Sequence, residues 1–149
     1  MDKPDTPAQL KARALRHLVR REHSRAELAR KLEPHAESVE ALQALLDQLA
    51  SSKQLSDERY AEGRVRTLSR KYGTARIRHD LRSKGVSDQI VTSVSSEGEL
   101  ERAKAILARK YREPAATPEE RARRARFLQS RGFPMELIAR LLRGSEEFA

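Results

Sequence analysis

The sequence contains no cysteine and no tryptophan, and its aromatic side chains are limited to three Phe and three Tyr. Without cysteine the chain has no disulfide, no zinc–thiolate or iron–sulfur site and no cysteine nucleophile. It also lacks the run of about 18 apolar residues that a membrane-spanning helix needs. The first five residues have no apolar core of the kind found in a signal peptide. We therefore expect a cytoplasmic protein with no membrane contact.

Patterns that carry catalysis are missing as well. The sequence has no glycine-rich phosphate loop, no Gly-x-Gly-x-x-Gly and no Gly-x-Ser-x-Gly. Its four histidines, at positions 17, 23, 35 and 79, form no metal-binding pair, and each is expected on the surface. A nuclease would need a carboxylate–metal cluster, but helix starts and a solvated face account for the acidic residues better. We expect no enzyme activity, no cofactor and no metal.

Charge is what the sequence has in excess. Of 149 residues, 31 are Lys or Arg and 22 are Asp or Glu, which leaves a formal net charge of +9. Charged residues make up 36% of the chain and hydrophobic residues only 38%, so thin helical layers fit it better than a thick core. The length suits one domain or a few small repeats. A positive excess of this size favours a polyanionic partner, with nucleic acid first.

Turn residues and apolar periodicity together predict helices. Residues 39–49 place leucines at heptad-like offsets, as an amphipathic helix does. Thr6 and Thr117 each precede a proline, and this pair of residues is typical of a helix N-terminus. All six prolines and all glycines except Gly63 fall outside the expected helix interiors or in a first turn. No stretch sustains the period-two alternation of a strand. The sequence therefore predicts nine helices and no sheet.

Two short sequences occur twice, which indicates an internal repeat. Leu-Ser-Arg-Lys-Tyr at 68–72 returns as Leu-Ala-Arg-Lys-Tyr at 107–111, 39 positions later. Leu-Arg-Ser-Lys-Gly-Val at 81–86 returns as Leu-Gln-Ser-Arg-Gly-Phe at 128–133, 47 positions later. The two offsets differ by about the length of residues 113–120, which we interpret as a loop insertion. The N-terminal third of the chain matches this pattern more loosely.

Three tandem three-helix repeats, stacked into an elongated and curved all-α array, are the simplest interpretation. Each repeat is too small to bury its own apolar face, so stacking on a neighbour completes the burial. The expected boundaries are an N-terminal tail at 1–7, repeats at 8–54, 55–97 and 98–144, and an acidic C-terminal tail at 145–149.

Basic residues concentrate in the first two helices of each predicted repeat. The balance of charges is +6 over 11–31, +7 over 64–84 and +7 over 102–131, against −5 over 33–62. Stacking of the repeats would align these segments into one positive track that binds phosphates. The alternative is three ordinary solvated helix faces, since Lys and Arg are good helix formers. Tyr72 and Tyr111 could stack on bases, but their spacing favours core positions.

Three segments resemble the RecX family of bacterial recombinase regulators. They are Leu-Ser-Asp-Glu-Arg-Tyr-Ala at 55–61, the segment 73–86 and the Phe-Leu-x-x-Arg-Gly-Phe core within 121–133. The segment 73–86 has the family's Gly, Arg-Ile, a Leu four residues after the Ile, and Lys-Gly-Val. Thr74 stands where the family often has Pro, and Asp80 where it often has Glu. The resemblance extends over about residues 10–144.

The resemblance implies an all-α regulator of the RecA recombinase. Such proteins bind the RecA filament on single-stranded DNA, lie along its groove, and restrain its ATP hydrolysis, strand exchange and co-protease activities. In this way they limit recombination and the SOS response. An elongated basic array without an active site agrees with that role.

The expected partners are therefore the RecA filament and the phosphates of single-stranded DNA, and positive self-repulsion favours a monomer. Nine cations are the hypothetical contacts: Arg70, Lys71, Arg76, Arg78, Arg82, Lys84, Arg109, Lys110 and Arg131. A stand-alone basic DNA-binding module is the alternative. It would bind DNA without RecA nearly as tightly as with it.

Overall fold

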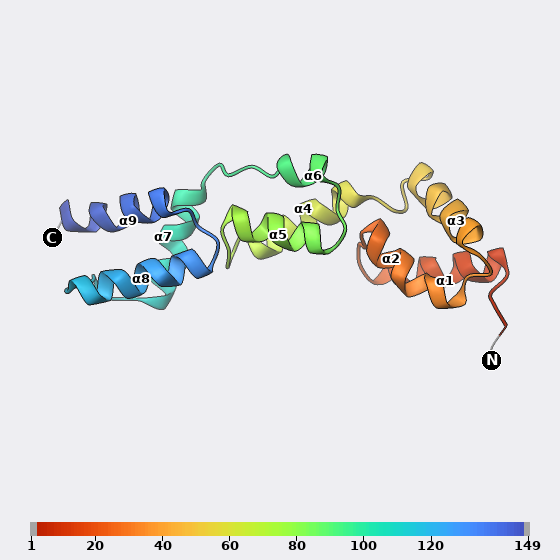
Figure 1. The fold of residues 1–149 in the computed structure, drawn as a ribbon, viewed down its shortest axis with the longest axis horizontal. Helices are drawn as coiled ribbons and strands as arrows, with labels where there is room; N and C mark the ends of the chain where they lie inside the picture. The colour runs from red at the N-terminus through yellow and green to blue at the C-terminus, as the bar shows by residue number, and fades with distance from the viewer. Residues whose placement is uncertain (1–2, 148–149) are drawn as a thin grey trace. The chain divides into compact units, whose positions relative to one another are not determined.

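The computed structural model describes residues 3–147 and, over this range, contains nine α-helices, one short 3₁₀ helix and no strand (Figure 1). The helices are α1 (Pro7–Arg20), α2 (Arg25–Leu32), η1 (Glu33–His35), α3 (Val39–Ser51), α4 (Asp57–Leu68), α5 (Thr74–Ser83), α6 (Asp88–Thr92), α7 (Glu99–Lys110), α8 (Pro118–Ser130) and α9 (Met135–Glu147). The prediction of an all-α chain is confirmed. No helix within residues 3–147 is long and apolar enough to cross a membrane.

The predicted starts of α1 and α8 are confirmed by their capping hydrogen bonds. The Thr6 hydroxyl accepts a hydrogen bond from the Gln9 N–H, and the Gln9 side chain accepts one from the Thr6 N–H. The Thr117 hydroxyl accepts one from the Glu120 N–H. These bonds satisfy N–H groups that the first turn of a helix leaves without a partner.

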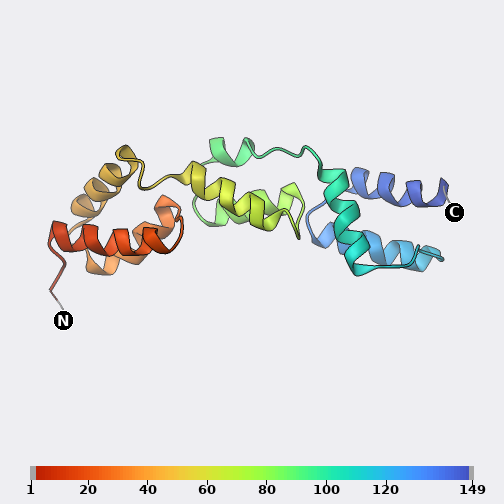
Figure 2. The same cartoon turned by 180° about the vertical axis from the view of Figure 1, so that it is seen from behind.

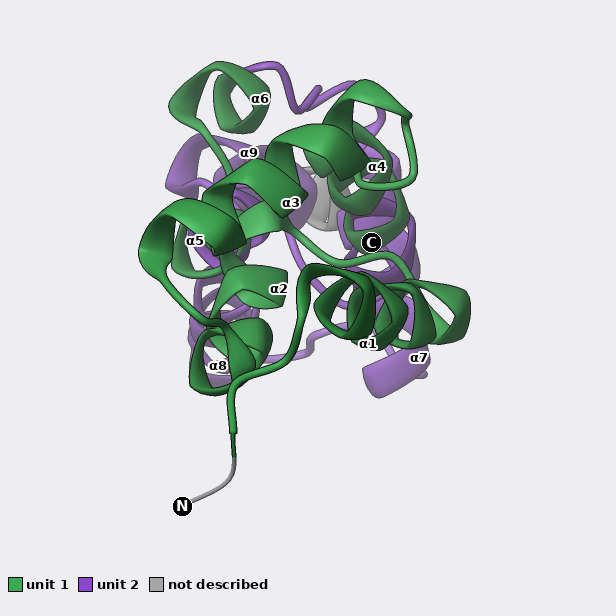
Figure 3. Cartoon of the chain, turned by 90° about the vertical axis from the view of Figure 1, so that its right-hand side faces the viewer, with its two compact units in different colours: residues 1–64, 81–92 green, residues 65–80, 93–149 purple. Residues whose placement is uncertain are grey.

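Contacts within the chain gather its residues into two compact units, coloured separately in Figure 3. Unit 1 comprises residues 1–64 and 81–92, and unit 2 comprises residues 65–80 and 93–149. The residues of the predicted second repeat, 55–97, are therefore divided between the units, and the repeat boundaries stay a prediction. Residues 145–147 of the predicted acidic tail lie in α9, and residues 1–2 and 148–149 lie outside the described range.

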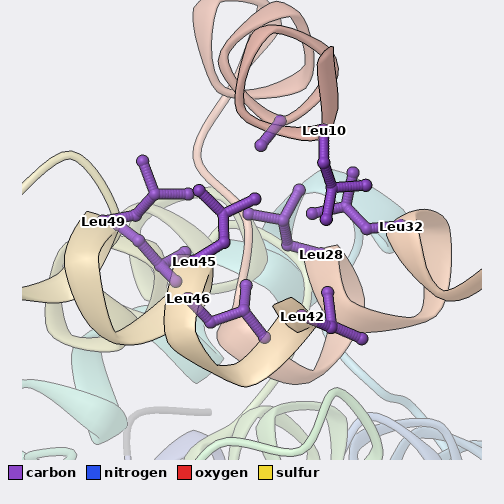
Figure 4. Packing of buried hydrophobic residues seen from close by; sticks show 9 residues of the cluster. Leu10, Leu28, Leu32, Leu42, Leu45, Leu46 and Leu49 are labelled. Atoms are coloured by element: carbon purple, nitrogen blue, oxygen red, sulfur yellow. The ribbon is translucent and has the colours of Figure 1, made fainter. Parts of the chain in front are cut away.

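Leucines form the core of unit 1. Figure 4 shows side chains of α1, α2 and α3 converging on one another. Leu46 and Leu49 of α3 and Leu28 and Leu32 of α2 are fully buried. Burial of each such side chain is worth about 1.5–3 kcal/mol, so this stripe of leucines supplies most of the cohesion of α1–α3.

The core of unit 2 comes from its last three helices. Figure 2 shows α7 crossing beside α8 and α9, and the three helices contact one another. Ala103 and Ile106 of α7, Leu128 of α8 and Ile138 of α9 are buried together, and Phe133 joins them from the turn between α8 and α9.

In unit 1, the N-terminus of α2 receives contacts from two later parts of the chain. An Asp57 Oδ1 accepts a hydrogen bond of 2.7 Å from the Arg25 N–H. The Ser24 hydroxyl donates to the Lys84 carbonyl at 2.7 Å. Gly85, with φ +78°, lies so close that a Cβ there would come within 2.4 Å of the Ala26 Cβ. The start of α4 and the end of α5 therefore both lie against the start of α2.

Unit 2 contains the same arrangement at the N-terminus of α5. A Glu99 Oε1 accepts a 2.9 Å hydrogen bond from the Thr74 N–H, and the Gly73 N–H donates to the Arg131 carbonyl at 2.7 Å. Gly132, with φ +93°, would place a Cβ 2.4 Å from the Arg76 Cβ. We call each arrangement a helix joint. In both, a carboxylate caps an N–H of another helix, and a glycine after a helix packs against that same helix start.

The glycine of the second joint generates a prediction with an internal control. Gly132→Ala introduces both an unfavourable positive φ and a clash with Arg76. Gly98→Ala introduces only the positive φ, here +74°, because a Cβ at this position would meet no described atom within 4 Å. We expect Gly98→Ala to lower the free energy of unfolding by about 1–2 kcal/mol and Gly132→Ala by at least about 1 kcal/mol more. Urea unfolding followed by circular dichroism measures both; equal losses of stability would contradict the joint.

One expectation about the histidines is wrong. His23 is only 1% exposed, because the turn between α1 and α2 folds it inward. Its Nδ1 lies 3.0 Å from the Arg21 carbonyl oxygen and its Nε2 lies 2.9 Å from the Lys31 Nζ. An ammonium group only donates, so Nε2 accepts and Nδ1–H donates to the carbonyl. The ring of His17 lies 5.7 Å away, centroid to centroid.

The burial of His23 predicts a loss of stability in mild acid. Burial, and then the positive charges of Arg21 and Lys31, lower the pKa of His23 below its usual 6.5, although the Arg21 carbonyl and Glu27 raise it. A histidine with a lowered folded pKa contributes stability that is present above about pH 6.5 and lost as the pH falls through the folded pKa.

We expect the free energy of unfolding to fall between about pH 7 and about pH 5. His23→Gln keeps both an acceptor and a donor but does not titrate, so it should flatten this dependence. His17, whose pKa burial also lowers, accounts for a remaining slope. His79→Gln, at an exposed position, is the control and should leave the dependence unchanged. A steep dependence in His23→Gln would exclude the buried ring as its cause.

Candidate nucleic-acid interface

Positive charge is unequally shared between the two units. Unit 2 contains 17 Lys and Arg against 10 Asp and Glu, a balance of +7, whereas unit 1 contains 14 against 12. The charge excess of the chain therefore lies mainly in unit 2. This division was not visible in the sequence, where the segments 11–31 and 102–131 have similar balances.

Four of the nine arginines of unit 1 form short ion pairs with carboxylates. Four ion pairs of 2.7–2.8 Å join Arg13 to Asp5, Arg21 to Glu27, Arg25 to Asp47 and Arg59 to Glu22. Hydrogen bonds from Arg13 and Arg21 lower the pKa values of Asp5 and Glu27 respectively. Ion pairs that water still reaches on at least one side add little stability, but they reduce the positive field of this unit.

In unit 2, by contrast, cations gather around an open hollow of about 610 Å³. We call it the basic hollow; its lining residues are Arg70, Lys71, Tyr72, Ile106, Arg109, Lys110, Phe127 and Arg131. The first three follow α4, the next three come from the end of α7, and the last two come from the end of α8. The C-terminus of a helix carries a partial negative charge, which favours cations there. This attraction offsets part of the repulsion between the cations that these helix ends bring together.

Aromatic rings hold several of these cations in place. The Cζ atoms of Arg76 and Arg131 lie 4.7 and 5.4 Å from the centre of the Tyr72 ring. Lys110 Nζ and Arg131 Cζ lie 4.8 and 5.1 Å from the centre of the Phe127 ring. These distances suit cation–π attraction, which is worth about 0.5–1 kcal/mol at exposed sites. The two rings therefore help to order Arg76, Lys110 and Arg131.

Hydrogen bonds to backbone carbonyls connect the two sides of the basic hollow. Arg76 Nη1 donates to the Ser130 carbonyl at 2.8 Å, and Arg109 Nη2 donates to the Arg70 carbonyl. The second helix joint, through the Arg131 carbonyl, lies beside them. The end of α4 is thus held against the ends of α7 and α8.

Within the described residues, no carboxylate lines the basic hollow. Across this same part of the chain, none of its five lining cations is paired with an acidic side chain, and the guanidinium group of Arg76 is not either. Six positive charges are therefore left for an external anion to compensate. Among residues 3–147 the structure also contains no group of three or more acidic or histidine side chains arranged to hold a metal ion.

The structure brings six of the nine predicted contacts together and separates the other three. Arg70, Lys71, Arg76, Arg109, Lys110 and Arg131 surround the basic hollow. Arg78 is half-buried and donates to the Val94 carbonyl at 2.7 Å. Arg82, 3.7 Å from Asp88, and Lys84 belong to unit 1. Whether any of the nine binds a partner stays a prediction.

Sequence reasoning missed the apolar part of the site. Ile106 and Phe127 line the basic hollow, yet they appear in the sequence as ordinary core positions. Tyr72 is half-buried and holds two guanidinium groups, a role that its helical spacing did not indicate. The repeated Arg-Lys-Tyr sequence was the available signal, because it supplies cations from the segment after α4 and from the end of α7.

Glu99 is a positioning residue for this site, since its buried carboxylate caps α5 next to Arg76. We expect Glu99→Ala to lower the free energy of unfolding by about 1–2 kcal/mol, because a helix cap and a buried hydrogen bond disappear. Glu99→Gln retains an acceptor and should cost less. Glu101→Ala, two residues on and exposed, is the matched control and should stay within about 0.5 kcal/mol of the parent. Thermal or urea unfolding measures the free energy of unfolding of each variant. Equal losses for Glu99→Ala and Glu101→Ala would show that the Glu99 carboxylate has no special role in the joint.

Comparison with known proteins assigns family relationships to most of the chain. Residues 56–94 match the family model of the second three-helix domain of RecX, and residues 97–142 match that of the third. The Regulatory protein RecX of Ralstonia nicotianae is 44% identical over 146 residues, covering 96% of this chain and 92% of that protein. That of Herbaspirillum seropedicae is 44% identical over 133 residues, covering 87% and 86%.

Solved structures share the fold. The crystal structure of RecX from Lactobacillus salivarius matches with a TM-score of 0.82 and 20% identity, covering 95% of this chain and 97% of that one. A second crystal structure of a regulatory protein RecX matches with a TM-score of 0.72 and 22% identity, covering 91% and 72%. Together with the two three-helix domain models, these matches confirm the prediction of repeated three-helix units.

Proposed function

Because the chain belongs to the RecX family of regulatory proteins, we propose that it modulates the RecA recombinase by binding the RecA filament on single-stranded DNA. In this proposal it restrains the filament's ATP hydrolysis, strand exchange and co-protease activities, and so limits recombination and the SOS response. The observation that carries the proposal is the basic hollow, where six cations have no carboxylate partner among the described residues.

Unpaired cations suit a filament built on DNA. Each phosphate that a lysine or arginine neutralises releases condensed counterions, and this release supplies affinity that falls with added salt. A cation that is already paired with a carboxylate of the protein contributes less affinity, because the phosphate must first displace that carboxylate. The ion-paired arginines of unit 1 are therefore weaker candidates for this contact than those of the basic hollow.

Modulation then requires no chemistry by the protein itself. A ligand shifts a conformational equilibrium only by binding one state more tightly than another. A regulator that prefers one filament state would slow ATP hydrolysis by populating that state or by blocking growth. We propose the basic hollow as the central contact, with Arg82 and Lys84 as further contacts and a smaller contribution from Arg78, which is half-buried, whereas Arg76 and Arg109 are exposed.

The test is RecA ATP hydrolysis on single-stranded DNA, with increasing amounts of this protein at about 50 and about 200 mM salt. We expect inhibition that weakens at higher salt. Replacing Arg70, Lys71 and Lys110 by Ala should raise the half-inhibitory concentration about tenfold, at roughly 0.5 kcal/mol per charge. Replacing Arg16, Arg20 and Arg30 by Ala removes the same charge from exposed positions of unit 1 and should change it little.

The stoichiometry and the failures of this assay are also informative. Inhibition well below one protein per RecA would favour capping or disassembly, whereas inhibition only near saturation would favour coating of the groove. No inhibition, together with salt-sensitive binding to naked DNA, would overturn the proposal in favour of a stand-alone DNA-binding module. Equal effects of both triple variants would show that total charge matters and the basic hollow does not.

A further inference from the structure

Four of the six cations around the basic hollow contact neighbouring groups that help to order them. Arg76 and Arg109 donate to carbonyls across the hollow, and Arg131 and Lys110 lie over aromatic rings. Side chains that are already ordered give up less conformational entropy when a ligand arrives. These contacts favour the positions of four of the six cations before binding, namely Arg76, Arg109, Lys110 and Arg131.

The aromatic rings of the hollow are already in contact with these cations. Tyr72 and Phe127 are both half-buried, and each has two cationic groups within 6 Å of its ring centre. In proteins that bind single strands by stacking, a base needs an open aromatic face. Here a base would have to displace a guanidinium or an ammonium group that the ring attracts. The hollow offers charge and not a stacking platform.

The cations themselves are suited to phosphate. Four of the six are arginines, whose planar guanidinium groups donate paired hydrogen bonds to phosphate oxygens. Several such groups around one open hollow match a run of closely spaced phosphates. A single carboxylate or a small anion would leave most of the six charges uncompensated.

We propose that the basic hollow binds the backbone of a single nucleic-acid strand through its phosphates alone, and that Tyr72 and Phe127 position cations and do not stack on bases. This inference deepens the proposed function and rests on it for the identity of the ligand. Its consequence is that the protein binds the strand with the same affinity whatever its base sequence.

The first test compares two labelled strands of about 20 units with the same backbone, one with bases and one fully abasic, in a fluorescence anisotropy assay without RecA. Stacking of even one base is worth about fivefold in affinity or more. We expect dissociation constants that differ by less than fivefold. Binding of the abasic strand that is weaker by fivefold or more, or no binding of either strand, would overturn the inference.

The second test asks what the Phe127 ring does. Phe127→Leu keeps an apolar side chain but removes the ring that holds Lys110 and Arg131. If the ring positions cations, the substitution weakens binding of both strands by the same factor. If it stacks on a base, the substitution weakens binding only of the strand with bases, and the inference is wrong. Because each variant is compared with itself on two strands, a partial loss of fold cancels in the ratio.

Two further arms locate the site and test its chemistry. Replacing Arg70, Lys71 and Lys110 by Ala should reduce the salt slope of binding by about 2, at about 0.7 for each phosphate that is no longer neutralised. Replacing Arg16, Arg20 and Arg30 by Ala should leave this salt slope unchanged, and equal slopes in the two variants would place the site elsewhere.

Inorganic polyphosphate should displace both strands, while polyglutamate of equal charge should do so at least tenfold less well. Equal competition by polyglutamate would overturn the proposed recognition of phosphate, because any polyanion would then suffice.

Because none of these arms contains RecA, the inference and the proposed function fail separately. A protein that inhibits RecA but does not bind the abasic strand retains the proposed function without this inference. If the protein binds both strands equally but never inhibits RecA, the inferred recognition through phosphates stands and the proposed regulatory function is wrong.

Discussion

In each compact unit, a hydrogen bond between a carboxylate and a backbone N–H joins the starts of two different helices. Asp57 caps the start of α2, and Glu99 caps the start of α5. In both joints a glycine with positive φ allows a later helix end to approach the same start. An aspartate or glutamate thus satisfies N–H groups that the helix cannot satisfy itself. In unit 2 this contact decides which loop and helix ends meet, and the basic hollow lies where they meet.

Three kinds of contact allow six cations to lie around one hollow. Like charges repel, and the described residues place no carboxylate in the lining of the hollow. Their repulsion is offset by attraction to two rings, by the negative ends of α7 and α8, and by hydrogen bonds to backbone carbonyls. All of these partners leave the positive charge in place, whereas an ion pair such as Arg13–Asp5 in unit 1 cancels it. The fold therefore orders charge in one unit and neutralises much of it in the other.

Much of the helical structure could be predicted because its causes are local. Thr6 and Thr117 cap the helices that their sequence context indicated, and the leucines at 39–49 face one core. The repeated Ser-Lys-Gly and Ser-Arg-Gly sequences end in the two joint glycines, whose positive φ and close packing only glycine permits without strain. His23 was misassigned because its burial depends on Lys31 and the Arg21 carbonyl, which a turn brings together.

The sequence by itself determined the number of α-helices, the repeated three-helix units and the family, since periodicity, capping and short motifs are properties of neighbouring residues. It did not determine every helix end: Gly144 was expected outside a helix, but α9 continues through it to Glu147. Only the tertiary structure decided which charges are compensated by a carboxylate. Segments 11–31 and 102–131 look alike in sequence, yet Asp5 and Asp47 neutralise arginines of the first, while no carboxylate of the described residues pairs with the cations of the basic hollow. Charge compensation is decided by side chains that lie within a few ångströms of one another, and residues as distant in sequence as Tyr72 and Arg131 meet only when the chain has folded.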